Sequence, residues 1–187
     1  MPQNRQQRVR RLIFVTFLAH IALGFWFVER GLLNEDEGWY LYAARRIAEG
    51  AEPYRDFAFF QMPVYPRVIS SLIAPGPGSV IAGRWLSWLM LLLATGIVGL
   101  AAMRLRGLVG MLIAVVCLGL NPLVLGTAVL AKPYALCLLL ISGGLFMISS
   151  WDRRRMAAGF CLLGFAVGVR VSVGIPLLAL VFAHRRT

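Results

Sequence analysis

The sequence predicts an all-α protein that crosses a membrane several times, with one long polar loop between its first two spans. Apolar residues make up 59% of the 187 residues, charged residues only 14%, and the mean hydropathy is +0.76. Soluble domains are about half apolar and about a quarter charged. The apolar residues also occur in blocks of roughly membrane-spanning length rather than in amphipathic stripes. A soluble helical bundle with a large core is the less favoured alternative.

We expect about five to six membrane segments in a single transmembrane domain that covers residues 1–187. The segments are 12–28, 80–103, 108–126, 133–151 and a last stretch, 156–183, while 29–78 forms the first loop. The last stretch is interrupted by Gly168, Arg170, Gly174 and Pro176, and each half of it is short for a full crossing at about 1.5 Å per residue. It forms either a shallow or broken helical hairpin that turns near Arg170, or one tilted span.

The net charge of +11 comes mainly from short basic clusters at the ends of the apolar segments. Arginines precede the first span and recur at 104–106 and 153–155. Because basic residues that flank membrane helices stay in the cytoplasm, we expect a multi-pass protein of the cell (plasma or inner) membrane with a cytoplasmic N-terminus. The 29–78 loop, which holds seven of the eight acids, is then extracytoplasmic. Such clusters suit the lipid bilayer and its anionic headgroups, so no nucleic-acid partner is expected.

The loop begins with a predicted surface helix over 35–49. Asn34 can cap this helix, acidic residues crowd its first turn, and Gly50 can end it. We expect this helix to lie along the membrane with its aromatic residues, Trp39, Tyr40 and Tyr42, at headgroup level. The following segment, 53–66, contains three prolines and is predicted to be an ordered irregular loop.

Two kinds of charged residue stand out as candidates for chemistry. Asp36 and Glu37 follow the first span directly; adjacent acids at a helix start can be only capping charges, but a long aromatic loop is unusual for a simple anchor. Arg170 lies in an apolar stretch, where a cation is costly unless it is paired. Arg84 and Lys132 lie near the same outer boundary. Snorkelling to the interface is the structural alternative for all three cations.

Several motifs occur in an order that resembles a known family. The loop contains Asp36-Glu37-Gly38-Trp39-Tyr40-Leu41-Tyr42-Ala43-Ala44-Arg45, then Gly50, Pro53-Tyr54-Arg55-Asp56-Phe57 and Pro63. Ala82-Gly83-Arg84-Trp85-Leu86-Ser87 opens the second span, Asn121-Pro122 comes late in the third, and 164–170 lies in the last stretch. Over residues 30–180 these motifs resemble the N-terminal part of polyprenyl-phosphate-dependent glycosyltransferases of the GT-C fold. That group includes protein mannosyltransferases and lipid A aminoarabinose transferases.

The resemblance implies a GT-C-like fold and an inverting transfer of a hexose or pentose from a polyprenyl-phosphate-sugar donor at the extracytoplasmic face. Asp36 would be the catalytic carboxylate, a general base that takes a proton from the acceptor hydroxyl. Glu37 would assist it, or these two acids would hold a divalent cation. The substrate and its lipid phosphate would be bound by Arg170, Arg84, Lys132, Tyr54, Arg55 and Asp56.

The resemblance leaves alternatives open, because members of this family are longer and have more spans. The chain is then either the N-terminal module of a truncated or split enzyme, with a second membrane chain supplying the missing spans, or a degenerate copy without activity. Ala131-Lys132-Pro133 also stands where relatives often carry an acidic residue before a proline. A non-catalytic membrane protein, such as a lipid-phosphate-binding subunit, is the rival interpretation. A transporter is less favoured, because the acids cluster in a loop rather than within the spans.

Overall fold

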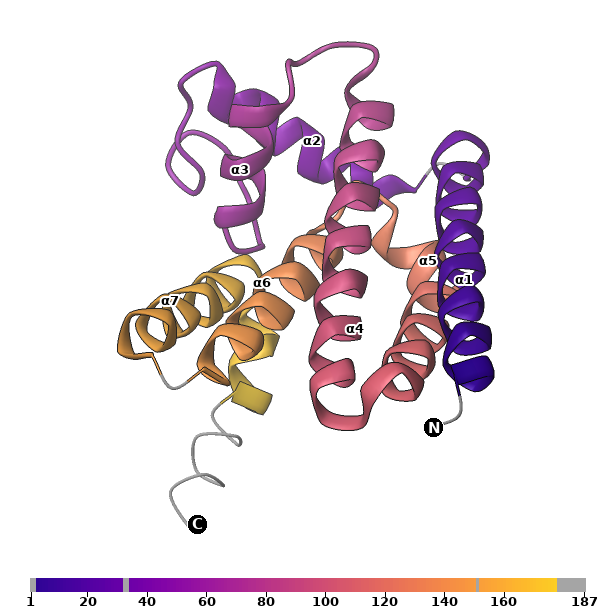
Figure 1. Ribbon diagram of the computed structural model, residues 1–187. Helices are drawn as coiled ribbons and strands as arrows, with labels where there is room; N and C mark the ends of the chain where they lie inside the picture. Colours follow the sequence, from indigo (N-terminus) through magenta and orange to yellow (C-terminus); the bar gives the residue numbers. More distant parts are fainter. Residues whose placement is uncertain (1–2, 32–33, 151, 178–187) are drawn as a thin grey trace.

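The computed structural model describes residues 3–31, 34–150 and 152–177 (Figure 1). This described part is helical and contains no β-strand, which confirms the all-α class. The elements are α1 (Gln3–Arg30), α2 (Glu35–Ala48), α3 (Val64–Leu72), α4 (Ser79–Gly119), α5 (Pro122–Ala128), α6 (Pro133–Ile148), α7 (Arg153–Val169) and the short 3₁₀ helix η1 (Val171–Val173). The helices α2 and α3 lie together at one end of the molecule (Figure 1).

Two or three of these elements are candidate membrane spans by length and composition. α1 and α4 are each long and apolar enough, and α5 with α6 qualifies as a third if the bend of 112° between them is a break within one span. The fold therefore supports a membrane-spanning protein. The predicted number of about five to six segments is larger for two reasons. α4 counts here as one helix although it contains a break, and α6 has 16 residues and α7 has 17, fewer than the roughly 20 of a full crossing. That larger number stays a prediction.

The long helix α4 consists of two arms. They join at Arg106, with φ −136° and ψ 15°, and Gly107, with φ 64° and ψ −158°, which are not helical values. Glycine suits position 107 because no Cβ opposes its positive φ. The chain reverses direction here (Figure 1). Gly99 of the first arm lies so close to Val115 of the second that a Cβ at position 99 would be 3.2 Å from a Val115 methyl carbon.

These two arms lie where spans 80–103 and 108–126 were predicted. The second arm stops early, at Gly119, because Asn121 starts a new helix. The Asn121 side chain accepts a hydrogen bond from Leu123 N at 2.9 Å, which satisfies a donor that a helix start leaves unpaired.

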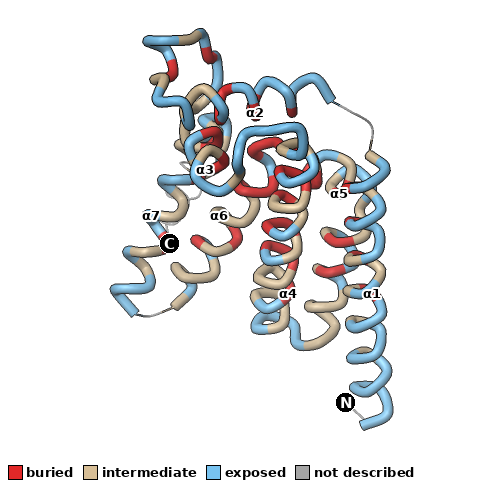
Figure 2. The backbone as a smooth tube through the Cα atoms, turned by 90° about the horizontal axis from the view of Figure 1, so that it is seen from above, coloured by how far each residue is buried: buried red, intermediate tan, exposed pale blue. Residues whose placement is uncertain are grey.

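Close contacts between helices hold the apolar part of the molecule together. At Gly24 of α1, a Cβ would lie 1.8 Å from Nε1 of Trp88 on α4, so a larger residue at position 24 would displace the Trp88 indole from its place between the two helices. Further down the same interface, His20 Nδ1 and the Gly119 carbonyl oxygen are 2.6 Å apart. Buried residues recur along α4, whereas much of α1 is exposed (Figure 2). The exposed apolar residues of α1, among them Leu12, Phe14, Leu18 and Phe25, suit contact with lipid.

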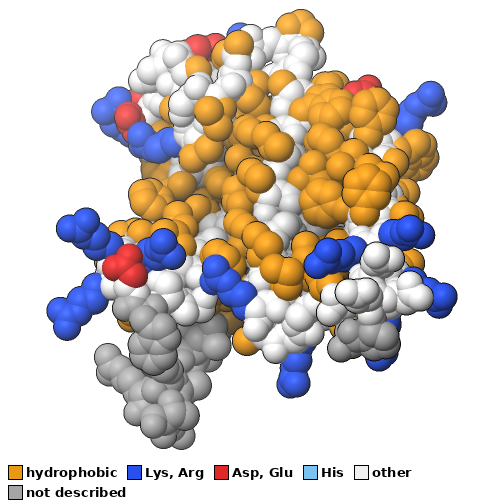
Figure 3. Space-filling view, viewed as in Figure 1, with side chains coloured by type: hydrophobic (Ala, Val, Ile, Leu, Met, Phe, Trp, Pro, Cys, Tyr) orange, Lys and Arg blue, Asp and Glu red, His pale blue; other side chains and the backbone are white. Residues whose placement is uncertain are grey.

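The two ends of the molecule differ in character. The N-terminal end of α1, the turn within α4 and the junction of α6 with α7 lie at the end opposite α2 and α3 (Figure 1). These three places carry the basic clusters before the first span, at 104–106 and at 153–155. Hydrophobic side chains cover the middle of the face in Figure 3, and basic side chains lie mostly below them. The clusters thus lie at one end, as the positive-inside argument requires.

The start of the polar loop folds as the sequence predicts. The Asn34 side chain accepts a hydrogen bond from Asp36 N at 3.1 Å and caps α2, and Gly50 follows the helix with φ 89°. The irregular segment reaches only to Pro63, since α3 begins at Val64. The proline at position 66 is tolerated there because the first turn of a helix needs no backbone N–H from it.

The expected headgroup position is wrong for one of the three aromatic residues of α2. Tyr40 is only 7% exposed, and its ring packs at right angles to that of Tyr65 of α3, with 5.3 Å between ring centroids. This burial raises the pKa of Tyr40 above its ordinary value. Trp39 and Tyr42 remain exposed on the other side of α2. Tyr40 faces the interior because α3, which was not predicted, covers that side.

The helix α7 ends where a break was expected. Its last residue is Val169, and Arg170 is extended, with φ −153° and ψ 109°. The second half of the stretch 156–183 is described only to Leu177, and 178–183 lies outside the described residues. A hairpin and a tilted span therefore both remain open.

Candidate functional site

A buried ion pair joins the first turn of α2 to the start of α4. Arg84 Nε and Nη2 donate hydrogen bonds to Glu37 Oε1 and Oε2 at 2.8 and 2.6 Å, and both side chains are 2% exposed. The planar guanidinium and the planar carboxylate match through these two parallel bonds. Snorkelling is therefore wrong for Arg84. Its charge is met by Glu37 inside the protein.

The same pair also holds the ends of two other elements. Arg84 Nη1 donates a hydrogen bond to the Gly31 carbonyl oxygen, just past α1, at 2.9 Å, and Glu37 Oε1 accepts one from Ala131 N at 2.9 Å. Both Glu37 oxygens are thus occupied, which suits a positioning role better than proton transfer. Four segments that are far apart in the sequence meet at these two side chains. We refer to the pair and its two backbone contacts as the clamp.

Asp36 is the reachable carboxylate beside the clamp. Its Oδ2 accepts a hydrogen bond from Lys132 Nζ at 2.7 Å, and its side chain is 68% exposed whereas that of Lys132 is 9% exposed. In the described residues Oδ1 has no hydrogen-bond partner. Glu37 thus contacts Ala131, and the adjacent Asp36 contacts the adjacent Lys132. The clamp therefore fixes the position of Asp36. A ligand can reach Asp36 but not Glu37.

Arg170 lies at the break after α7 without an ion-pair partner in the described part of the chain. Its guanidinium covers the ring of Tyr134, 4.6 Å from the centroid, and its Nε lies 3.2 Å from Ser172 Oγ, to which it donates a hydrogen bond. The acids considered as its partners, Asp36, Glu37 and Asp56, each pair with another basic residue. The positive charge of Arg170 therefore remains to be met by something other than these carboxylates.

A cavity of about 320 Å³ lies between the irregular loop and the end of α7. Its lining includes Tyr54, Phe59, Phe60, Met62, Arg170 and Ser172. We call it the Arg170 cavity. It brings together two residues that the sequence selected separately, Tyr54 and Arg170. Phe60 and the ring partner Tyr134 were missed, although the pair Phe59-Phe60, directly after the loop motif, was a signal for an aromatic wall.

The remaining two loop candidates pair with each other. Arg55 Nε and Nη2 donate hydrogen bonds to Asp56 Oδ1 and Oδ2 at 2.9 and 2.8 Å, and Asp56 Oδ2 also accepts one from Glu52 N at 2.8 Å. The Arg55 guanidinium and this backbone N–H lower the pKa of Asp56 to about 2. Both side chains lie on an exposed turn and do not line the Arg170 cavity. They stabilise the turn that presents Tyr54, which has a φ of 70°.

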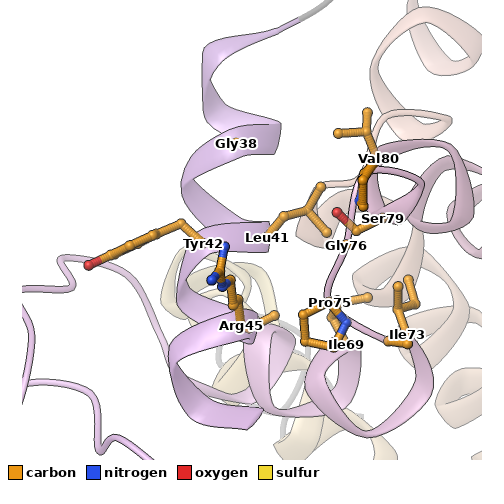
Figure 4. A pocket seen from close by; sticks show the side chains of 13 residues that line it. Gly38, Leu41, Tyr42, Arg45, Ile69, Ile73, Pro75, Gly76, Ser79 and Val80 are labelled. Atoms are coloured by element: carbon orange, nitrogen blue, oxygen red, sulfur yellow. The ribbon is translucent and has the colours of Figure 1, made fainter. Parts of the chain in front are cut away.

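A second cavity, of about 460 Å³, lies between α2, α3 and the segment that joins α3 to α4 (Figure 4). Its walls are mainly apolar: α2 contributes Leu41, and α3 with the residue after it contributes Ile69 and Ile73, while Tyr42 and Arg45 also come from α2 (Figure 4). None of the candidate residues for chemistry lines it. It is therefore separate from Asp36 and from the Arg170 cavity.

Asp36 and Glu37 were also candidate ligands for a divalent cation. They do not converge, since Asp36 faces Lys132 and Glu37 faces Arg84. In residues 3–31, 34–150 and 152–177, no three His, Cys, Asp or Glu side chains gather as a metal site. Comparison with models of protein families, with curated proteins and with solved structures gave no match. The function is therefore inferred from the geometry of the site and from the sequence motifs.

Proposed function

We propose that this chain is a membrane glycosyltransferase, or the N-terminal module of one, that transfers a sugar from a polyprenyl-phosphate donor to an acceptor. The proposal rests mainly on one observation: an exposed carboxylate, Asp36, is held in place by a buried clamp where α1, α2 and α4 meet. The resemblance of the loop motifs to GT-C enzymes supports it. In this proposal the arrangement is GT-C-like, with about five to six membrane segments.

Asp36 would act as the general base. Its unpaired Oδ1 takes the proton from the acceptor hydroxyl, and the hydroxyl oxygen of the acceptor attacks the anomeric carbon of the donor sugar. Lys132 holds Oδ2 of Asp36 during this step. The bond between the anomeric carbon and the donor phosphate breaks on the opposite face, so the configuration inverts and the phosphate leaves with the bonding electrons. Arg170 would meet that leaving charge.

Sugar transfer by Asp36→Asn tests this mechanism. The rate of sugar transfer by this variant should be at least roughly hundredfold lower than that of the wild type, because that is what a general base contributes. Glu35→Gln, which neutralises the adjacent exposed acid, is the matched control and should keep the wild-type rate. Because Asp36→Asn also leaves the Lys132 ammonium without its carboxylate, the double variant Asp36→Asn, Lys132→Met should be equally inactive. Near-normal turnover in either Asp36 variant would leave Asp36 as a capping residue only.

The rival is a non-catalytic subunit or an inactive remnant that binds a lipid phosphate. The ion pair of Asp36 with Lys132 favours it, because a carboxylate with a partner at 2.7 Å can be purely structural. Purified chain, alone and with a candidate partner chain, separates the two: donor binding without transfer in both preparations would support the subunit. Transfer with and without a chelator tests the divalent cation.

We place the chain in the cell (plasma or inner) membrane, multi-pass, with a cytoplasmic N-terminus. The basic clusters at the end opposite α2 and α3 support this orientation (Figure 1). Single cysteines introduced at exposed positions in 45–75 should react with an impermeant reagent added outside. Cysteines at 104–107 and 152–155 should react only after the membrane is opened. Outside labelling at 152–155 would reverse the assignment.

A further inference from the structure

We propose that two stacked aromatic side chains beside Asp36 bind a pyranose ring of a glycan acceptor. They are Trp39 of α2 and Phe60 of the loop that follows it, and we call their two rings the aromatic platform. The inference deepens the proposed function and rests on it for the role of the glycan as the acceptor. Binding of the sugar needs no transfer, so it is testable separately.

The aromatic platform is flat and exposed. The interplanar angle between Trp39 and Phe60 is 5°, and their ring centroids are 6.2 Å apart. Trp39 is 38% exposed and Phe60 is 84% exposed. The face of an aromatic ring is negatively polarised and attracts C–H bonds, which are positively polarised. A pyranose with equatorial hydroxyls presents such C–H bonds on each face of its ring, so the platform matches the apolar surface of a sugar.

A buried phenylalanine supports the platform. Phe59, 3% exposed, lies nearly parallel to Trp39, at an interplanar angle of 14° and with 6.1 Å between ring centroids. The ring of Phe59 is itself packed against three others, those of Tyr40, Tyr54 and Phe57. Because these contacts exist without a ligand, little ordering is left for a sugar to impose, which favours binding.

The reachable carboxylate of Asp36 lies one helical turn before Trp39. Residues three apart on a helix are neighbours, with about 5–6 Å between their Cβ atoms. Asp36 is 68% exposed, and in the described residues only its Oδ2 accepts a side-chain hydrogen bond, from Lys132. A carboxylate accepts hydrogen bonds, and a sugar hydroxyl at the edge of the ring can donate one. A pyranose on the platform therefore directs a hydroxyl to the proposed base.

A sugar suits this surface better than an anionic lipid headgroup does. Glu35 and Asp36, both exposed, place negative charge beside the platform, and Lys132 offsets only one of these charges. Like charges repel, so anionic headgroups are disfavoured here. Phe60 has no polar group, whereas the aromatic residues that anchor a protein among headgroups are mainly Trp and Tyr. The headgroup position expected for Trp39 from the sequence is thus the competing outcome.

The experiment measures the binding of three probes to the full chain in nanodiscs by ligand-observed NMR, with empty nanodiscs subtracted. Cellotetraose has pyranose rings with equatorial hydroxyls, and sorbitol has hydroxyls without a ring. A peptide rich in Ser and Thr offers the hydroxyls of a protein acceptor. Cellotetraose should bind at least about tenfold more tightly than sorbitol or the peptide.

Leucine variants of the platform keep an apolar side chain but remove its flat face. Trp39→Leu and Phe60→Leu should each weaken cellotetraose binding about fivefold, whereas Trp39→Phe should retain most of it. Trp26→Leu and Phe160→Leu change exposed residues of the same types in α1 and α7. These two controls should bind cellotetraose like the wild type.

Quenching by brominated lipids tests the headgroup alternative. The difference in fluorescence between the wild type and Trp39→Phe reports on Trp39. This difference should be the same in nanodiscs with and without brominated lipids. Its loss in the brominated nanodiscs would place the ring among the lipids and overturn the proposal.

Two further results would overturn it: sorbitol or the peptide binding as tightly as cellotetraose, or unchanged cellotetraose binding by either Trp39→Leu or Phe60→Leu. Binding of cellotetraose that depends on both rings, without sugar transfer, would sustain the platform and count against the glycosyltransferase. Sugar transfer to the peptide, with the same KM for the peptide in the wild type and in Trp39→Leu, would do the reverse.

Discussion

Removal of one partner of the buried Glu37–Arg84 pair should destabilise the protein far more than removal of an exposed acid. In Glu37→Gln the side chain keeps its shape and one acceptor oxygen, but the Arg84 guanidinium, 2% exposed, loses its counter-charge. Breaking such a pair typically costs about 3–5 kcal/mol, because an uncompensated charge stays buried. The contacts to Gly31 and Ala131 place the damage where four segments meet, so the whole fold should respond.

Equilibrium unfolding in detergent micelles measures this effect. Trp85, directly after Arg84, and Trp88, one helical turn after it, pack edge to face at 5.2 Å between ring centroids and provide a local fluorescence signal. The matched control is Glu49→Gln, whose carboxylate pairs with Arg45 and Arg46 on the exposed side of α2. Exposed pairs of this kind contribute little, so the control should unfold like wild type.

The double variant Glu37→Leu, Arg84→Leu gives a further check. It removes both charges together, so no charge is left buried, and it should recover part of the stability that Glu37→Leu alone loses. Two results would show that the clamp does not hold the fold. In the first, Glu37→Gln is no less stable than Glu49→Gln. In the second, the losses of stability in the single variants Glu37→Leu and Arg84→Leu simply add in the double variant.

Two further predictions concern the helix interface and the loop. Gly24→Ala places a Cβ 1.8 Å from Trp88 Nε1 and should lower the free energy of unfolding by about 1–3 kcal/mol. The control Gly96→Ala, at a helical position with nothing within 4 Å, should leave that free energy unchanged or raise it by up to about 1 kcal/mol. A Gly96→Ala variant less stable than Gly24→Ala would refute the packing of α1 on α4. Arg55 and the Glu52 N–H lower the pKa of Asp56 to about 2. The contribution of Asp56 to loop stability is therefore fully present above the ordinary pKa of an aspartate and is lost as the pH falls to the lowered pKa of about 2. After correction for intrinsic rates, the backbone amides of 51–63 should therefore be equally protected from hydrogen exchange at about pH 7 and about pH 4. Their protection should be lower in Asp56→Asn at both pH values. Loss of protection in the wild type at about pH 4 would contradict the assignment.

Several features of this protein follow from the sequence alone, because they depend on local chemistry. Block-wise hydrophobicity predicts membrane helices, since a bilayer offers no partners for unpaired backbone groups. The cap by Asn34, the end of α2 before Gly50 and the break at Arg170 follow from residues within a few positions of each feature. The prominence of Asp36 and Glu37 was likewise visible as acids at the start of a predicted helix.

The roles of those acids depend on contacts that no local pattern contains. Glu37 meets Arg84 across 47 residues, and Asp36 meets Lys132 across 96 residues. In the sequence the two carboxylates are equivalent neighbours. In the fold, successive residues of a helix point in directions about 100° apart, so Glu37 turns inward to the buried guanidinium while Asp36 stays exposed. Only the packing of α4 and of the segment before α6 against α2 separates a positioning acid from a reachable one.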